Sequence, residues 1–167
     1  RMGIQRDGLG RMAARVAFDG SGTVTKRFEY EYNEAGLMEK KIRRDPENQM
    51  SWYARYQYDA CGRRIEQCNY DRQGTPTTRV TFYYDAQGER IRNEVYDADG
   101  RLIKTHVYLY DARHRRVSDW IADPTGEIRS STKYVYGNSG FVSRIEYIDR
   151  DGRLEGYNEI DSDSNGN

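Results

Sequence analysis

Short segments of alternating apolar and polar positions, separated by polar turn signals, divide this chain into regular steps. An Asp-x-x-Gly quartet or a close variant ends at positions 10, 22, 36, 48, 62, 74, 88, 100, 114, 126, 140, 152 and 166, in steps of 12 and 14 residues. The intervening segments of 8 and 10 residues alternate as a half-buried strand does; in one of them Ile103, Val107 and Leu109 share a face. Apolar residues do not recur at intervals of three and four. The pattern therefore predicts strands and no helix.

Each quartet has the chemistry of a turn. Asp at the first position can accept hydrogen bonds from backbone N–H groups two residues on, and Gly at the last position supplies a positive φ. Asn48 and His114 replace that Gly in two copies, and Asn tolerates the left-handed region better than His does. We assign this structural turn role in particular to Asp59, Gly62, Asp85, Gly88, Asp97 and Gly100.

Four-residue connections leave no room for a crossover, so consecutive strands must be antiparallel neighbours. The sequence predicts an all-β fold of tandem 26-residue β-hairpin repeats. They form one long antiparallel meander of about 12 strands, as a twisted, coiled or shell-like sheet. About six repeats occupy residues 1–160, and residues 161–167 are interpreted as a polar turn or tail at the cut edge of a longer array.

Alignment of the 26-residue units places aromatic residues in columns. One column contains Tyr30, Tyr56, Phe82, Tyr108 and Tyr134, and another contains Tyr32, Tyr58, Tyr84, Tyr110 and Tyr136. Cross-strand aromatic pairs stabilise a sheet by about 0.2–1 kcal/mol each. The chain has 22 Arg and only 5 Lys, which favours guanidinium stacking on these rings.

Composition limits the classes of function. Lys and Arg balance Asp and Glu at 27 each, which excludes a strongly basic nucleic-acid binder. No run of 18 apolar residues is present, so no membrane span is expected. With 36% hydrophobic residues a thick two-layer core is not expected, while 13% aromatic residues argue against disorder.

Two stretches carry a resemblance to a known family. Residues 96–102 (Tyr-Asp-Ala-Asp-Gly-Arg-Leu) and 58–64 (Tyr-Asp-Ala-Cys-Gly-Arg-Arg) resemble the YD repeat of Rhs and teneurin-type proteins, and the tandem pattern extends over nearly the whole chain. The resemblance implies a long antiparallel sheet that spirals into a hollow shell. It also implies a secreted or cell-surface bacterial location, either around a toxin or as a structural module.

Candidate catalytic residues are few. His106 lies in a variable strand column and His114 in a turn slot, so both are interpreted as structural repeat positions. Cys61 and Cys68 are too far apart along an extended strand for a disulfide. We expect this chain not to be an enzyme.

One segment has the ligand types of a calcium loop. Residues 161–166 match its first six positions, with Asp161, Asp163 and Asn165 as candidate ligands. The bidentate acid expected six residues later is absent, and Asp163 with Gly166 continues the turn series. The sequence favours a repeat turn over a calcium site, and no cofactor is expected.

Two functional hypotheses follow. The favoured one is a structural repeat segment of a shell wall, stalk or fibre, whose partners are neighbouring repeats and whose edge strands permit self-assembly. The alternative is a carbohydrate or cell-wall-binding module, for which the aromatic platforms would be Trp52, Trp120, Tyr108 and Tyr110. Aromatic columns that are uniform along the array favour the structural hypothesis, because a dedicated site would concentrate distinctive residues in one or two units.

Overall fold

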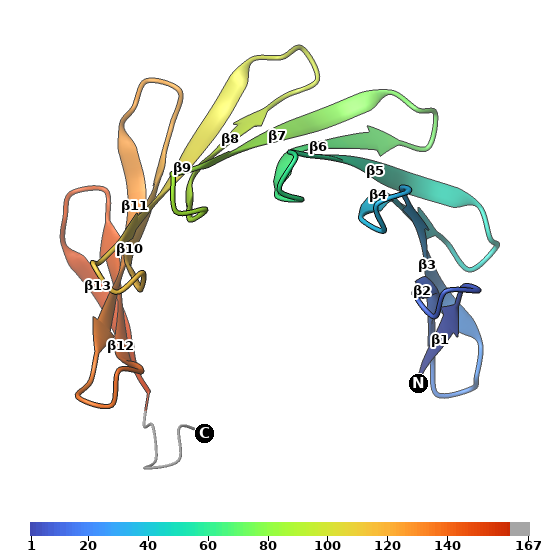
Figure 1. Cartoon of the computed structure of the whole chain (residues 1–167), viewed down its shortest axis with the longest axis horizontal. Coiled ribbons are helices and arrows are strands. Elements are labelled where there is room, and N and C mark those ends of the chain that lie inside the picture. Colours follow the sequence, from blue (N-terminus) through green and yellow to red (C-terminus); the bar gives the residue numbers. More distant parts are fainter. Residues whose placement is uncertain (161–167) are drawn as a thin grey trace. The chain divides into compact units, whose positions relative to one another are not determined.

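A computed structural model describes residues 1–160, which form thirteen β-strands and no helix (Figure 1). The first seven strands are β1 (Met2–Arg6), β2 (Met12–Phe18), β3 (Val24–Tyr32), β4 (Met38–Arg44), β5 (Met50–Tyr58), β6 (Arg64–Asp71) and β7 (Pro76–Tyr84). The remaining six are β8 (Arg90–Tyr96), β9 (Leu102–Tyr110), β10 (Arg116–Ala122), β11 (Ile128–Tyr136), β12 (Val142–Asp149) and β13 (Leu154–Glu159).

Strand order in the sheet follows the chain order from β1 to β13, which confirms the predicted antiparallel meander. The chain divides into two units. The first comprises Arg1–Thr81 with Asp97–Gly100, and the second comprises Phe82–Tyr96 with the chain from Arg101 onward. Within each unit, neighbouring strands pair antiparallel. The estimate of about 12 strands omitted β1, which precedes the first turn.

The turns share one geometry, which the loop at Asp7 illustrates. The Gly10 N–H donates to the Asp7 carbonyl at 3.0 Å, and the Asp7 N–H donates to the Arg11 carbonyl at 2.9 Å. Asp7 Oδ1 also accepts from the N–H groups of Leu9 and Arg11, at 2.9 Å each. The fourth residue of each of the twelve described turns has a positive φ, including Asn48 (62°) and His114 (60°). Such a turn followed by a left-handed residue forms a bulge at the start of the next strand.

Nine-residue strands alternate with strands of seven or eight residues from β2 to β12, and we call these long and short strands. A long strand pairs with its two neighbours through different halves. In β3, residues 24–29 pair with β2, and residues 27–32 pair with β4. The last residues of a long strand therefore have no backbone partner on the preceding short strand.

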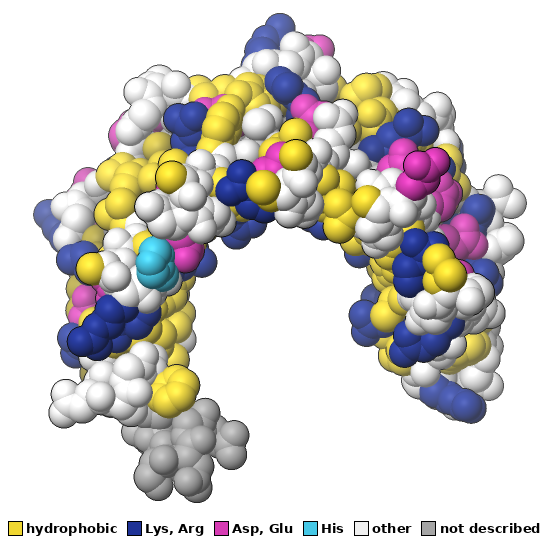
Figure 2. Space-filling view, in the orientation of Figure 1, with side chains coloured by type: hydrophobic (Ala, Val, Ile, Leu, Met, Phe, Trp, Pro, Cys, Tyr) yellow, Lys and Arg dark blue, Asp and Glu magenta, His cyan; other side chains and the backbone are white. Residues whose placement is uncertain are grey.

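The sheet is a single layer, and none of its described side chains is completely buried. Its buried apolar residues are Ala14, Val16, Ile42, Ala54, Tyr56, Tyr108 and Ala122. Apolar, basic and acidic side chains are interspersed over the visible surface (Figure 2). With so little core, the fold depends on contacts between neighbouring strands.

Candidate functional site

A tyrosine at the end of four of the long strands, β3, β5, β9 and β11, reaches back to the start of the preceding short strand. The hydroxyls of Tyr32, Tyr58, Tyr110 and Tyr136 donate to the carbonyl oxygens of Met12, Met38, Arg90 and Arg116, at 2.9, 2.8, 3.1 and 2.8 Å. Each of these carbonyls lies beyond the last backbone pair of its strand with the long strand; the β10–β11 register, for example, ends at Ser118–Lys133. The hydroxyl therefore satisfies a carbonyl that the sheet leaves unpaired. We call these side chains hook tyrosines.

Arginines lie between the rings of the other aromatic column, the one that contains Tyr56, Phe82, Tyr108 and Tyr134. In the second unit, the Arg116 guanidinium lies 4.5 Å from the Tyr108 ring centroid and 5.2 Å from that of Tyr134. Arg90 lies 4.9 Å from Tyr108 and 5.9 Å from Phe82. In the first unit, Arg64 lies 4.2 Å from the Tyr56 ring. Cation–π contacts of this kind replace part of the apolar packing that a second layer would supply.

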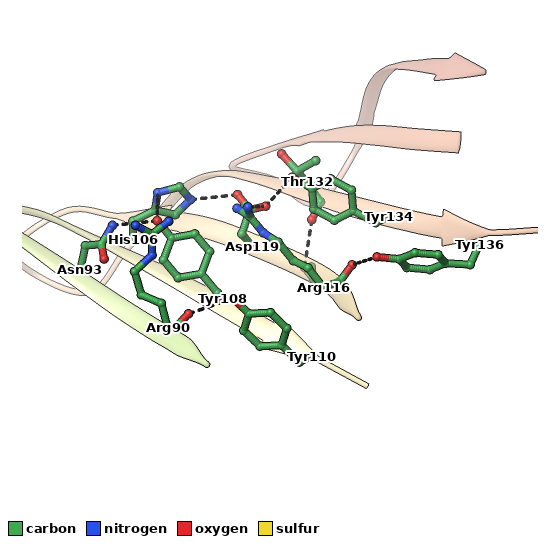
Figure 3. A network of polar contacts seen from close by, with 11 residues as sticks. Arg90, Asn93, His106, Tyr108, Tyr110, Arg116, Asp119, Thr132, Tyr134 and Tyr136 are labelled. Atoms are coloured by element: carbon green, nitrogen blue, oxygen red, sulfur yellow. Dashed lines mark hydrogen bonds and ion pairs between the residues drawn. The ribbon is translucent and has the colours of Figure 1, made fainter. Parts of the chain in front are cut away.

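In the second unit, a polar network joins the stacked side chains of Tyr108 and Arg116 to a buried carboxylate (Figure 3). Asp119 is 7% exposed, and it is the buried charged residue among residues 1–160. Its Oδ2 accepts from the Tyr134 hydroxyl at 2.8 Å and lies 2.7 Å from Arg116 Nη2. Its Oδ1 lies 2.9 Å from His106 Nε2. A buried carboxylate requires this degree of pairing.

One assignment of donors and acceptors satisfies all the hydrogen bonds from Asn93 to Asp119. Asn93 Nδ2 donates to the Tyr108 hydroxyl oxygen at 2.8 Å, so the Tyr108 O–H can donate to His106 Nδ1, which is 3.1 Å away. His106 Nε2–H then donates to Asp119. Both imidazole nitrogens are occupied by protein partners, as expected for a structural position. Burial and the hydrogen bond to Asp119 raise the pKa of Tyr134 to about 12.

The turn carboxylates form a second group of polar sites. The side-chain hydrogen bond from Arg115, together with the backbone N–H groups of Arg115 and Arg113, lowers the pKa of Asp111 to about 2. Hydrogen bonds from the Thr125 hydroxyl and from Arg129 lower the pKa of Asp123 to about 2. Each of these aspartates is engaged by its own loop. Gly62, Gly88 and Gly100, at the ends of three other turns, have φ values of 77°, 88° and 79°.

Of the four residues considered as a carbohydrate platform, the three in the second unit do not share one exposed surface. Tyr108 is only 4% exposed beneath Arg90 and Arg116, and the Tyr110 hydroxyl is engaged as a hook. Trp120 pairs with Val107, on the face opposite the one that carries Tyr108.

Trp52 belongs to the first unit, where it adjoins a shallow hollow of about 390 Å³. Ser51, Trp52, Asn69, Tyr70, Asp71, Thr77 and Thr78 line this hollow. Asn69 Nδ2 donates to the Thr78 hydroxyl at 2.7 Å, and the ring centroid of Phe28 lies 6.3 Å from that of Trp52. The hollow thus places an aromatic ring beside amide and hydroxyl groups.

Several other predicted sites can be located. Asp161, Asp163 and Asn165, the candidate calcium ligands, lie outside the described residues. Within residues 1–160, no three His, Cys, Asp or Glu side chains converge as a metal site. Cys61 and Cys68 are free thiols. No helix capable of crossing a membrane occurs in the described part of the chain.

Sequence reasoning did not identify the hook acceptors or the role of Asp119. The 20-residue spacing between each hook tyrosine and its acceptor is visible in the sequence, as in Tyr136 and Arg116. Spacing alone does not indicate that the acceptor is a backbone carbonyl. Asp119 was detectable as an acid within a strand segment rather than in a turn.

Comparison with known proteins places the chain in a family. A family model matches residues 56–165, and its description is "Uncharacterised protein". The chain belongs to this uncharacterised protein family. The family match covers β6 to β13 completely, and thus the whole Asp119 network. A search of curated proteins found no match.

Solved structures with a similar arrangement of strands include a chain of the Photorhabdus luminescens Tc holotoxin pore. The identity is 13% and the TM-score 0.49, over 95% of this chain and 9% of the toxin chain. A porin-like protein from Bacteroides uniformis matches at 10% identity and a TM-score of 0.40, over 94% of this chain and 89% of that one. The chain spans only about a tenth of the toxin chain's length. At these identities and scores, the likenesses carry no argument about function.

Proposed function

We propose that this chain is a non-enzymatic structural repeat segment of a large secreted or cell-surface bacterial protein, forming part of a shell wall, stalk or fibre. The observation that carries the proposal is the recurrence of the hook. Tyr32 and Tyr58 in the first unit and Tyr110 and Tyr136 in the second make the same bond to the preceding short strand. A fold in which the same contact recurs has the same local geometry in each 26-residue repeat, as a wall or fibre requires.

The first and last strands of the described sheet, β1 and β13, support the proposal. In β1, Met2 and Ile4 are 47% and 55% exposed, and in β13, Leu154 and Tyr157 are 56% and 54% exposed. Neither strand contains Lys or Pro, the residues that commonly block edge pairing. Such edges favour pairing with further strands through backbone hydrogen bonds.

The polar network also supports a structural role. Every polar group that Asp119 and His106 present to the network is matched by a group of the same sheet. The sequence resemblance to the YD repeat supports a secreted or cell-surface location for the parent protein.

Sedimentation velocity over a range of concentrations tests this function. We expect concentration-dependent association that the double substitution Ile4→Lys and Leu154→Lys suppresses, because charges on both edges oppose strand pairing. The matched control is Leu109→Lys, an equally exposed apolar position (48%) on the inner strand β9. A chain that stays monomeric at every concentration contradicts the proposal.

The second candidate function is carbohydrate or cell-wall binding, favoured by the hollow beside Trp52. Saturable binding of a soluble cell-wall polysaccharide that Trp52→Ala abolishes, while circular dichroism remains unchanged, would support it. Retention of that binding in Trp52→Ala would exclude this hollow as the site.

A further inference from the structure

We propose that Tyr53 and Tyr70 form an oxidative modification site, at which a haem peroxidase with hydrogen peroxide couples the two rings into an intramolecular dityrosine. The product joins β5 to β6 in the first unit by a covalent bond. The modification does not depend on pairing at the strand edges. It is carried by the stacking of these two rings and by their separation from the other tyrosines of the unit.

The register of the sheet brings the two rings together. Tyr53 of β5 is directly opposite Tyr70 of β6, a position at which Cβ atoms are about 5 Å apart. The ring centroids are 4.6 Å apart, and the ring planes are inclined by only 6°. The Lys40 ammonium, on the neighbouring strand β4, lies 5.3 Å from the Tyr53 ring. Because parallel rings at this separation are in van der Waals contact, the ring carbons that must bond are already neighbours.

The pair is separated from the other tyrosines of its unit by the sheet itself. The first unit contains six tyrosines. Strand alternation and register place four of them on the face opposite the one that carries Tyr53 and Tyr70, namely Tyr30, Tyr32, Tyr56 and Tyr58. Coupling within the first unit is therefore directed to a single pair.

A tyrosine pair in the second unit shows the opposite arrangement. The Arg116 guanidinium lies 4.5 Å from the Tyr108 ring centroid and 5.2 Å from that of Tyr134. This side chain occupies the space through which the two rings would have to meet. Tyrosines of the same aromatic column are therefore kept apart, whereas Tyr53 and Tyr70 have no such group between their rings.

The surroundings of the pair favour ring oxidation over thiol oxidation. Both tyrosines are half-buried, so part of each side chain remains open to an oxidant. Burial, with smaller effects of Cys68 and Tyr53, raises the pKa of Tyr70, and the stack is uncharged at neutral pH. Burial and the Glu66 carboxylate raise the pKa of the Cys68 thiol beside Tyr70. Because the thiolate is the reactive form, this raised pKa makes Cys68 less able to consume the oxidant.

The coupling balances with one molecule of hydrogen peroxide. Each tyrosine loses one electron and its phenolic proton, which gives two phenoxyl radicals with spin density on the ring carbons ortho to oxygen. A bond forms between one such carbon of each ring, and the hydrogen that each carbon carried moves to the phenoxyl oxygen and restores the phenol. The two electrons and two protons reduce the peroxide to two molecules of water.

The test treats the full chain, diluted to disfavour encounters between copies, with a haem peroxidase and a limited amount of hydrogen peroxide. We expect dityrosine fluorescence from a monomer that has lost two hydrogen atoms. After digestion with trypsin, the peptide of residues 45–55 should be joined to that of residues 65–72. Each of these peptides contains one tyrosine, Tyr53 or Tyr70, so the mass of the joined peptides identifies the bond. The treated chain should also unfold at a higher urea concentration, because the bond closes a loop in the unfolded chain.

Tyr70→Phe separates this chemistry from a purely structural role of the stack. Phenylalanine retains the ring but has no phenolic hydrogen to lose, so the variant should keep its circular dichroism and lose the joined peptides. Tyr147→Phe, at an exposed tyrosine (40%) in the second unit, is the matched control and should give the wild-type yield. The inference is overturned if the joined peptides do not form or if other tyrosines couple in equal yield. Dityrosine found only between copies of the chain would also contradict it.

Discussion

The Tyr136 hydroxyl donates to the Arg116 carbonyl oxygen at 2.8 Å, although the two residues are 20 positions apart in the sequence. The bond lies where the pairing between β10 and β11 has already ended, at Ser118 and Lys133. One side chain therefore completes the hydrogen bonding of a neighbouring strand. The bond recurs at four of the long strands and so adds contacts between strands to a single-layer sheet with little core.

Removal of one hook hydroxyl should destabilise the sheet. Tyr136→Phe retains the ring beneath Arg115 but leaves the Arg116 carbonyl without its donor. We expect a loss of about 1 kcal/mol in the free energy of unfolding, measured by urea denaturation. Tyr157→Phe is the control, because the Tyr157 ring is exposed at an edge, and it should change stability by less than about 0.5 kcal/mol. Equal effects from the two substitutions would contradict the role of the hook.

His114 provides a test of the turns. It has a φ of 60°, where a residue with a Cβ is strained and Gly is not. His114→Gly should stabilise the chain by about 0.5–1 kcal/mol in urea denaturation, although it removes a 3.6 Å contact with Glu89. Arg113→Gly, one residue earlier in the same turn, should not stabilise. Stabilisation by both substitutions would mean that the position of positive φ is not the cause.

Substitution of Asp119 should be among the most damaging single changes in the second unit. Asp119→Ala removes the acceptor of His106 and Tyr134, and it also removes the ion pair of Arg116 with Asp119. We expect the free energy of unfolding to fall by about 3 kcal/mol. For Glu155→Ala, on the exposed strand β13, it should fall by less than about 0.5 kcal/mol. Thermal unfolding followed by circular dichroism compares the two. A small effect at Asp119 would show that the network contributes little to stability.

The turn carboxylates predict that the stability of the fold decreases at acid pH. The pKa values of Asp111 and Asp123 in the folded chain are about 2, below the ordinary value of 3.8. A group whose pKa is lowered by folding stabilises the fold above its unfolded pKa, and that stability is lost as the pH falls through its folded pKa. The urea midpoint should therefore fall between about pH 4 and pH 2. In Asp111→Asn, which cannot ionise at this position, the fall should be smaller; an unchanged fall would exclude Asp111 as a contributor.

Local chemistry made the strands and turns predictable, because the Asp-x-x-Gly spacing specifies both the connection length and the residue of positive φ. Asn48 and His114 fit that geometry even without Gly. The hook was not predictable, because its acceptor is a backbone carbonyl exposed by the bulge at the start of a short strand. The pairing of His106 with Asp119 was also missed, since it runs diagonally: His106 is directly opposite Ile121, and Asp119 is opposite Tyr108.

The central claim is that this chain meets its partners through its strand edges. Hydrogen exchange, mapped along the chain at low and high protein concentration and with added cell-wall polysaccharide, tests it most directly. The account predicts that association slows exchange in β1 or β13 and leaves the segment around Trp52 unchanged. Protection of β5 to β7 by the polysaccharide, with no concentration-dependent protection of either edge, would contradict it.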